Sequence, residues 1–411
     1  MSKKIAVSQL KPGMYITDVG SDWMTHPFFR QQFQVKDDHV IERLIKAGIH
    51  EVYIDPSRGL DVADAPSAQE VQQSLETELV RLAAASSGHT PMLALREATQ
   101  DAQRVYEEAT RIIRSVMHDV RLGRQVQGAD VEPAVRDITS TIIQNRDALL
   151  SLCRVKTKDH YTFQHSVSVG ALEVTFCRAL GLDVETTRLA GIGGLLHDIG
   201  KICVPDEILN KPARLTEDEF QTMKRHVIEG KRVLEEADQI DPLSIQVAYE
   251  HHERADGSGY PEGRRGSEIS LLGRMAAICD VYDALTSERV YHRPMLPHEA
   301  LRKIFEWSKF HFDPQLVHQF VRIIGIYPVG TLVLLRSGRI GVVVEQSEQS
   351  LLTPRVRVFY DSVHEAAIPP LDIDLSRPMG QGGADEIAAP ADPDAWGLDW
   401  TKSLGLTFWS P

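Results

Sequence analysis

The segment GLLHDIGK, residues Gly194–Lys201, sets a histidine beside an aspartate where an apolar run ends, with a lysine three residues after the aspartate. Two ionisable neighbours at such a point have two ordinary explanations. They are the polar end of a capped helix, or they are half of a metal site. A single His-Asp pair does not distinguish the two, because helices commonly end in polar residues. The residues on either side of the segment have to decide.

Histidines gather on both sides of this segment. Seven of the sixteen in the chain fall between residues 160 and 292. Most of these stand in the stretches KDHYTFQHS (158–166), MKRH (223–226) and YEHHERADGSGYP (249–261), and two aspartates follow in ICDVYDAL (278–285). Neutral imidazole and carboxylate are ligands that manganese, iron and zinc accept without any thiolate.

Each of these residues also has a simpler interpretation. His165 alone fits a histidine on a helix surface, and Asp280 alone fits a helix cap. His251 and His252 would point about 100° apart on a helix, as at a solvated helix end. Because the order H, HD, H, HH and D lies within one mostly helical region, the set predicts a metal centre between facing helices. The carboxylate of Asp198 could bridge two ions about 3.5–4 Å apart, which would clamp a phosphoryl group.

The region from about residue 155 to 325 resembles the HD-GYP domain, a subgroup of the HD metal-dependent phosphohydrolases. The matching stretches are DHYTFQHS (159–166), HDIGK (197–201), HHERADGSGYP (251–261) and CDVYDALTSERVY (279–291). The third stretch follows the pattern HHExxDGxGYP, which is long and highly specific. The module at residues 1–60 and the hairpin after Tyr327 resemble parts that often flank such domains.

The resemblance implies a helical bundle that hydrolyses cyclic di-GMP, a bacterial second messenger, to linear pGpG and leaves open a second cut to GMP. It also implies two sets of metal ligands that share one carboxylate. The ligands of the first ion would be His165, His197, Asp198 and Asp280. The ligands of the second ion would be Asp198, His226, His251 and His252.

The resemblance also assigns residues to the substrate. Asp198 and Lys201 would serve catalysis, with Lys201 on the scissile phosphate. The residues around the guanosine and phosphate groups would be Asp159, Asp283 and Arg289. A rigid loop beside the site would be formed by Gly259, Tyr260 and Pro261, since proline fixes φ and glycine permits a tight turn.

The chain departs from the family pattern at two positions. Members with three metals carry a glutamate four residues before the first histidine ligand, where this chain has Tyr161. We therefore expect two divalent transition-metal ions, iron or manganese, and not three. His292 stands where many members have lysine, so the grip on the substrate is expected to be weaker or pH-sensitive there.

Composition bounds the partners of the protein. Of the 411 residues, 45 are Lys or Arg and 58 are Asp or Glu, so the formal charge is −13. Because neutralising a phosphate backbone needs a basic face, we do not expect a nucleic-acid polymer as partner. The four cysteines form no CxxC pair, and neither a signal peptide nor an apolar stretch of about 18 residues is visible. These features predict a reduced, cytoplasmic protein without a membrane span.

The patterns predict a mainly α chain in five parts. These are a small α/β module (1–60), a helical linker (61–145), a helical-bundle HD-type catalytic domain (146–325), a short β-hairpin element (326–375) and a disordered tail (376–411). In the linker, apolar residues at three- and four-residue steps over 98–120 predict an amphipathic helix that is a dimer seam or packs on its own chain. The tail contains Trp396, Trp400 and Trp409, which leaves open that it docks on a partner or on its own body.

Three other functions are compatible with parts of the sequence. The first is an HD phosphohydrolase for another nucleotide, which the intact DGSGYP block disfavours. The second is a catalytically weak regulator that binds cyclic di-GMP or a partner, which the complete ligand set disfavours. The third is an enzyme that also docks a diguanylate cyclase or another signalling protein, in pathways such as biofilm formation and motility.

Overall fold

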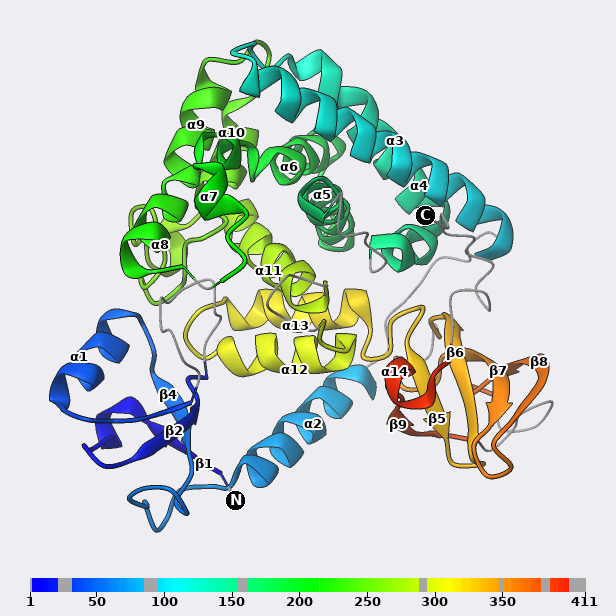
Figure 1. Ribbon diagram of the computed structural model, residues 1–411. Helices are drawn as coiled ribbons and strands as arrows, with labels where there is room; N and C mark the ends of the chain where they lie inside the picture. The colour runs from blue at the N-terminus through cyan, green and yellow to red at the C-terminus, as the bar shows by residue number, and fades with distance from the viewer. Residues whose placement is uncertain are drawn as a thin grey trace.

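Helices make up most of the chain and gather in a bundle, with a small sheet on each side of one end (Figure 1). The computed structural model describes residues 2–20, 32–84, 95–153, 161–213, 215–287, 294–347, 350–377 and 385–398. The mainly α architecture is the fold class that the sequence predicts.

The centre of the bundle is built from α5 (Tyr161–Ala179), α6 (Val184–Leu196) and α11 (Leu271–Thr286), which are buried on most sides. Their sequences are largely apolar around the whole circumference, as expected for helices enclosed by others. Small residues let α5 and α6 approach closely, because a Cβ added at Gly194 would lie 2.9 Å from the Cα of Gly170. This contact brings the end of α6, where the His-Asp pair stands, against α5.

Shorter helices and turns complete the bundle. These elements are η3 (Ile199–Cys203), α7 (Asp206–Leu209), α8 (Glu217–Lys224), α9 (His226–Glu235), α10 (Pro242–Glu250), η4 (Gly266–Glu268), α12 (Pro297–Trp307) and α13 (Pro314–Ile324). Of these, α9 and α10 lie near α6, and α12 and α13 lie near α11. Both α10 and α13 begin with a proline after an aspartate cap, Asp241 and Asp313, which fixes where the helix starts.

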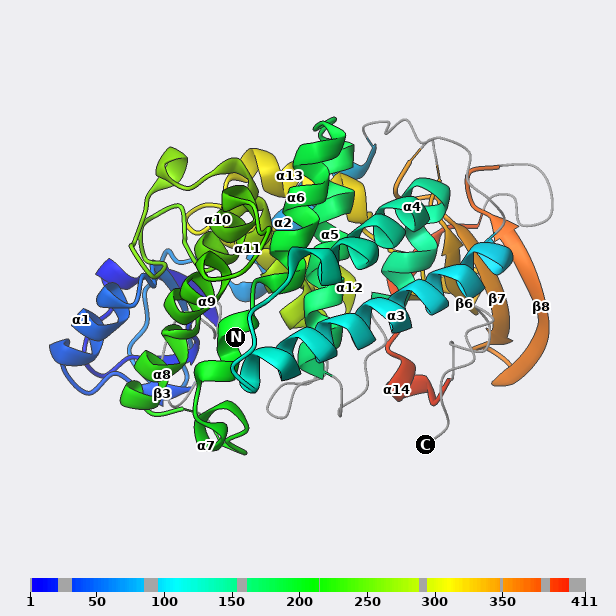
Figure 2. The same ribbon diagram turned by 90° about the horizontal axis from the view of Figure 1, so that it is seen from above.

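α3 (Leu95–Arg121) and α4 (Gly128–Cys153) are part of the bundle (Figure 2). The apolar face of α3, which includes Val105, Ala109 and Ile113, packs with α4, α5 and α6 in one core cluster. From residue 95 onward, the predicted helical linker (61–145) is therefore packed into the bundle. Of the two interpretations of the 98–120 helix, packing on its own chain is confirmed, so its apolar face is not a dimer seam.

The N-terminal module is a sheet with one helix, as the sequence predicts. The strands β1 (Lys3–Ala6), β2 (Tyr15–Asp18), β3 (Phe33–Gln34) and β4 (Glu51–Ile54) stand in the order β1-β4-β2-β3 and pair antiparallel. The remaining elements are η1 (Val7–Gln9) and α1 (Asp38–Lys46). After α1 the chain turns into β4 through Gly48, which has a φ of 70° that favours glycine.

The C-terminal part is a five-stranded antiparallel sheet in the order β8-β7-β6-β5-β9. β5 (Leu332–Leu335) and β6 (Arg339–Glu345) are the expected hairpin, and β7 (Arg355–Asp361) and β8 (Ala366–Asp374) extend it. β9 (Ile387–Pro390) lies in the predicted disordered tail, yet it pairs with β5. That prediction is wrong for residues 385–398, because the tail covers a strand edge that would otherwise be open.

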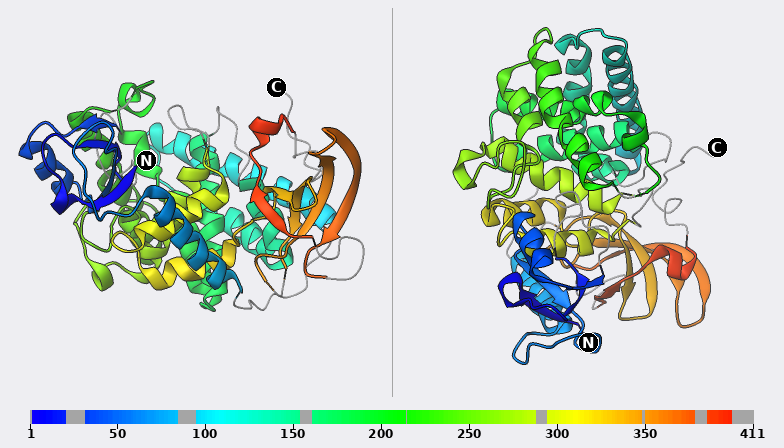
Figure 3. Two further views of the ribbon diagram at one scale, coloured as in Figure 1. Left: turned by 90° about the horizontal axis from the view of Figure 1, so that it is seen from below. Right: turned by 60° about the vertical axis from the view of Figure 1, so that its left-hand side comes forward.

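The tail continues into α14 (Pro393–Trp396), and the ring of Trp396 lies 6.3 Å from that of Tyr360 between centroids. The described part of the tail therefore docks on its own body, while Trp400 and Trp409 lie outside the described residues. α2 (Ala68–Ala84) contacts α12 and α13 and lies between the two sheets (Figure 3). Among the described helices, none combines the length and the hydropathy that a membrane crossing requires.

We expect Ile113→Ala to lower the free energy of unfolding by about 2–5 kcal/mol, since the side chain is fully buried where α3 meets the bundle. The matched control is Ile143→Ala on α4, where the side chain is 57% exposed and the change should stay within about 0.5 kcal/mol. Chemical denaturation followed by circular dichroism measures both. Equal effects would mean that α3 does not share the core.

Candidate metal centre

Several segments of the bundle bring ionisable side chains to one buried point. They are α5, the junction of α6 and η3, the start of α9, the end of α10, and α11. The side chains, all at most 5% exposed, are His165, His197, Asp198, His226, His251, His252 and Asp280. The structure thus brings together every residue that the sequence suggested as a metal ligand.

One group, called site A here, consists of His165, His197 and Asp280. Their ligand atoms lie within 4.8 Å of one another. The Nε2 of His165 lies 3.1 Å from an oxygen of Asp280 and 3.3 Å from the Nε2 of His197. Two imidazoles and a carboxylate around one point are a donor set for manganese, iron or zinc.

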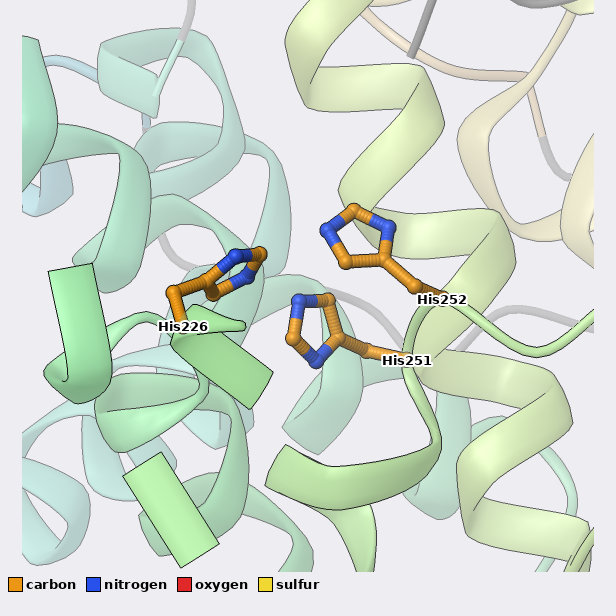
Figure 4. Close-up of side chains that lie close together, drawn as sticks. All are labelled: His226, His251 and His252. Carbon is orange, nitrogen blue, oxygen red and sulfur yellow. The ribbon is translucent and has the colours of Figure 1, made fainter. Parts of the chain in front are cut away.

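A second group, called site B here, consists of His226, His251 and His252, whose ligand atoms also lie within 4.8 Å of one another. Figure 4 shows the three rings turned toward a common point. The ring centroid of His226 lies 5.6 Å from that of His251 and 5.2 Å from that of His252. An ion between them would be bound by imidazole alone unless a neighbouring carboxylate also reached it.

Asp198 lies between the two sites and turns one oxygen toward each. Its Oδ2 lies 3.6 Å from the Nε2 of His165 and 3.3 Å from the Nε2 of His197. Its Oδ1 lies 3.5 Å from the Nε2 of His226 and 4.0 Å from the Nε2 of His251. A carboxylate in this position can be shared by two ions, so Asp198 faces both sites while His197 belongs to site A.

Backbone carbonyls orient three of the histidines in the same way. Each histidine stands just past the end of a helix, α6, α8 or α10, whose last carbonyls have no partner within the helix. Each donates its Nδ1–H over 2.7 Å to the carbonyl three residues earlier, in the pairs His197 with Gly194, His226 with Met223 and His251 with Ala248. Since a carbonyl only accepts, the proton is on Nδ1 and the Nε2 lone pair is free to bind a metal.

Several buried atoms of the site have no hydrogen-bond partner among the residues that the structure describes. They are Asp198 Oδ1, Asp280 Oδ2, the Nε2 atoms of His226 and His251, and His252 Nδ1. An unpaired buried polar atom costs about 1–3 kcal/mol, and a concentration of them around one point calls for an explanation. Divalent cations bound by these atoms would satisfy them, so the residues fit a metal centre.

The protonation states of the site B histidines and of Asp198 also suit metal binding. Burial lowers the pKa of His226 to about 4 and holds the pKa of His251 and His252 well below the ordinary value. Burial alone would raise the pKa of Asp198, but Lys201 and His197 hold it well below its ordinary value. Neutral imidazoles and an ionised carboxylate are the forms that bind metals.

Comparisons with known proteins agree with this geometry. The residues matched by a domain of unknown function (DUF3391) are 2–131, and those matched by an HD domain are 143–316. A cyclic di-GMP phosphodiesterase of Pseudomonas aeruginosa is 41% identical over 418 residues, which cover 99% of this chain and 98% of that protein. The chain belongs to the HD-GYP family.

Two other relatives match a smaller share of the chain. A cyclic di-GMP phosphodiesterase of Thermotoga maritima is 38% identical over 167 residues, or 40% of this chain and 45% of that protein. The 3'3'-cGAMP-specific phosphodiesterase 1 of Vibrio cholerae is 39% identical over 178 residues, or 43% of this chain and 41% of that protein. The HD-domain match begins inside α4, whereas the packed bundle also includes α3.

In this HD-GYP chain, Asp283 contacts His165 at Nδ1, the ring nitrogen that does not face the other residues of site A. Its Oδ2 lies 2.6 Å from the Nδ1 of His165, and the residue is 3% exposed. The family resemblance places Asp283 around the substrate, and the structure adds a contact with a proposed metal ligand. A carboxylate in that place orients the imidazole and raises its basicity. The spacing from Asp280 puts both carboxylates on one face of α11, which is the sequence signal for this role.

Residues 253–264 form a loop after His252, called the HD-GYP loop here. The loop packs against site B, as the resemblance suggested. The ring of Tyr260 stacks on that of His252, with 4.6 Å between centroids and 30° between planes. A Cβ added at Gly259 would lie 2.3 Å from a backbone nitrogen of the same loop, so only glycine fits. The buried Glu253 accepts backbone N–H groups of Glu262 and Arg264 at 2.8 and 3.0 Å and fixes the far side of the loop.

Some residues that the sequence singled out fall outside the described residues. Asp159, Arg289 and His292 lie in the ranges 154–160 and 288–293, and the side chain of Tyr161 is also outside. Lys201 is described, and its Nζ lies 2.5 Å from Asp198 Oδ2 with 23% of the side chain exposed. It can therefore reach a ligand that approaches Asp198 from solvent.

We expect the double variant His197→Ala with Asp198→Ala to lose most of the bound divalent metal, because it removes one residue of site A and the carboxylate that faces both sites. The matched control is His118→Ala with Asp119→Ala, since α3 carries a second His-Asp pair on its outer side. Elemental analysis of both purified proteins measures the difference. Unchanged metal content in the 197–198 variant would contradict the assignment of His197 and Asp198 as metal ligands.

We expect Asp283→Ala to weaken metal binding at site A by roughly 10–100-fold, because His165 loses the group that orients it. Asp283→Asn keeps an oxygen that accepts from His165 Nδ1 and should weaken binding less. Manganese titration followed by electron paramagnetic resonance resolves one weakened equivalent beside an unaffected one. Equal weakening of both equivalents would contradict a role confined to site A.

Proposed function

We propose that this protein is a metal-dependent phosphodiesterase that hydrolyses cyclic di-GMP to linear pGpG in bacterial second-messenger signalling. The observation that carries the proposal is the carboxylate of Asp198, with one oxygen toward site A and the other toward site B. The name of the relative that matches the whole chain supports cyclic di-GMP as the substrate. A second cut to GMP uses the same phosphodiester chemistry and remains compatible with the site.

We infer two divalent ions, iron or manganese, one at site A and one at site B. The donor set supports this inference, since it contains imidazole and carboxylate and no thiolate. Bound there, such ions supply Lewis acidity and lower the pKa of water. We expect no third ion, because Tyr161 offers a neutral phenol where a carboxylate would be needed.

Lys201 acts on the phosphoryl group in this proposal. Its ammonium group lies against Asp198, at the junction of the two sites, and part of the side chain remains exposed. A fixed positive charge there stabilises the negative charge that develops on the phosphoryl oxygens. Because Lys201 is not a metal ligand, its removal should affect the reaction more than metal binding.

The buried ligands and the HD-GYP loop leave the binding of the two guanosine groups to other residues. Asp159 and Arg289 keep this role as an expectation from the family resemblance, and His292 keeps its expected weaker grip. The proposal also includes a cytoplasmic location, which is supported by cysteines without a disulfide between them. A homodimer that uses a surface other than the buried apolar face of α3, and docking of a diguanylate cyclase or another signalling protein, are further parts of the proposal.

A second candidate substrate is 3'3'-cGAMP. It is favoured by the match to the Vibrio cholerae enzyme named for that substrate. That match covers less than half of either chain, whereas the Pseudomonas aeruginosa relative is matched nearly end to end. We therefore rank cyclic di-GMP first and treat the hybrid dinucleotide as the competing substrate.

The test uses purified full-length protein loaded with Mn(II), or with Fe(II) under anaerobic conditions, and separates nucleotide products by chromatography. We expect pGpG from cyclic di-GMP at a higher kcat/KM than hydrolysis of 3'3'-cGAMP. Lys201→Ala should retain its metal and lose roughly 10–1,000-fold in kcat/KM, as when one oxyanion donor is removed.

Three outcomes would count against the proposal. No product from either dinucleotide with both metal equivalents bound would favour a binding regulator. Faster hydrolysis of 3'3'-cGAMP would reverse the ranking of substrates. Loss of metal together with activity in Lys201→Ala would make that lysine structural, and Lys211→Ala, a partly exposed lysine paired with Glu219, controls for the loss of a surface charge.

A further inference from the structure

The turn between α1 and β4 of the N-terminal module touches the HD-GYP loop. The Nε2 of His50 lies 2.6 Å from the Oδ2 of Asp256. A Cβ added at Gly48 would lie 2.1 Å from the Cβ of Ser258, so the backbone of the turn contacts the loop directly. This turn falls within the match to the domain of unknown function, so the contact gives that domain a place in the catalytic unit.

Asp256 joins the contact to the conformation of the loop. Its Oδ1 accepts the N–H of Ser258 at 3.0 Å and the hydroxyl of Ser258 at 2.6 Å, while its Oδ2 faces His50. The ring of His50 is itself held by stacking on Phe310, with 4.3 Å between centroids and 19° between planes. One carboxylate therefore closes the turn at Ser258 and ties that turn to the module.

The module is anchored well enough to act as a support. Lys4 lies 2.6 Å from Glu306 of α12, and both side chains are only 7% exposed. The hydroxyl of Tyr53 donates to the same carboxylate at 2.7 Å, and Lys303 of α12 pairs with Asp18 at 2.9 Å. Lys4 also lies 2.6 Å from Glu51 of β4, so one buried lysine links the sheet of the module to α12.

The loop connects the His50–Asp256 contact to site B within a few residues. Ser258 stands two residues before Tyr260, whose N–H donates to the carbonyl of His252 at 3.1 Å and whose ring stacks on the His252 imidazole. On the other side of Asp256, the N–H of Ala255 donates to the carbonyl of His311 at 2.9 Å. The path from His50 to His252 thus consists of direct contacts in one short loop.

We propose that the N-terminal module is a positioning element for site B, and that His50 and Asp256 are positioning residues that hold the HD-GYP loop against His252. The described residues of the module contribute no atom to the two metal sites. The module restrains the loop so that the His252 ring stays aligned with His226 and His251. The proposal rests on the proposed function only in taking site B as a metal site.

The same contact raises an alternative, because ligand atoms of His50, Asp256 and His311 lie within 4.8 Å of one another and could hold an ion. Hydrogen bonds explain these atoms better. His311 Nε2 donates to the carbonyl of Gly48 at 3.2 Å, and His50 Nε2 donates to Asp256. Both nitrogens that would bind an ion therefore carry protons.

The experiment compares two ways of disturbing the contact in the full-length protein. His50→Ala removes the donor to Asp256, and Gly48→Ala inserts a methyl group between the turn and Ser258. His39→Ala, an exposed histidine on α1, controls for loss of a histidine from the module. Gly123→Ala controls for backbone strain, since its φ is 80° and no atom lies within 4 Å of the added Cβ. His50→Gln keeps an N–H donor and should restore the contact.

Hydrogen exchange over residues 253–264 and Mn(II) titration are the readouts. We expect faster exchange in His50→Ala and Gly48→Ala and roughly tenfold weaker binding of one Mn(II) equivalent, as when a group that orients a ligand is lost. The controls and His50→Gln should match the unmodified protein. If cyclic di-GMP is hydrolysed, kcat should fall in the same two variants.

Unchanged exchange and unchanged Mn(II) binding in both variants would overturn the proposal. So would outright loss of one metal equivalent in His50→Ala without faster exchange, which would make the His50 cluster a metal site. Neither readout needs turnover. A protein that binds Mn(II) and does not cleave cyclic di-GMP would therefore refute the proposed function and leave this inference standing.

Discussion

The carboxylate of Asp198 faces two groups of histidines at once, and the packing of the central helices has to bring both groups to it. One oxygen has to meet site A, which is built on α5 and α11, and the other has to meet site B, which is built on α9 and α10. The chain reaches this point at the end of α6, so α6 has to pack closely on its neighbours. The glycines at the α5–α6 contact provide that closeness, since side chains there would separate the helices.

The residues that suit a metal site also lower the stability of the fold when no ion is bound. Buried imidazoles and carboxylates without partners destabilise the folded protein on their own. Helix ends reduce part of the problem, because their free carbonyls accept the Nδ1–H groups of three histidines. What remains is a set of lone pairs that a cation can satisfy, so a cation bound there would stabilise the folded protein. The apolar interior of α5, α6 and α11 supplies the rigidity that keeps these atoms together.

The N-terminal module and the C-terminal tail make contacts that the helices of the bundle do not make. The N-terminal module packs on α12 through the buried pair of Lys4 and Glu306, and its α1–β4 turn reaches the HD-GYP loop. At the other side of the same end, β9 returns along the chain to cover β5. Both contacts join residues that are far apart in sequence, and neither carries a local motif.

The sequence by itself determined the family, the mainly α fold and the set of residues that meet at the candidate metal centre, because the spacing of the H, HD, HH and GYP motifs is local and specific. It also determined the sheet and helix of the N-terminal module, where alternation and turn residues are strong signals. It did not determine what covers the apolar face of α3. An amphipathic pattern predicts that one face of a helix is buried, but it does not say which other element packs on that face. The sequence missed β9 because strand pairing over some 50 residues depends on an edge that exists only in the folded sheet. Likewise, whether Asp283 meets the substrate or His165, and whether His50 reaches Asp256, depends on how helices and modules pack. These contacts are decided by tertiary structure, because each requires two surfaces whose relative placement no single segment encodes.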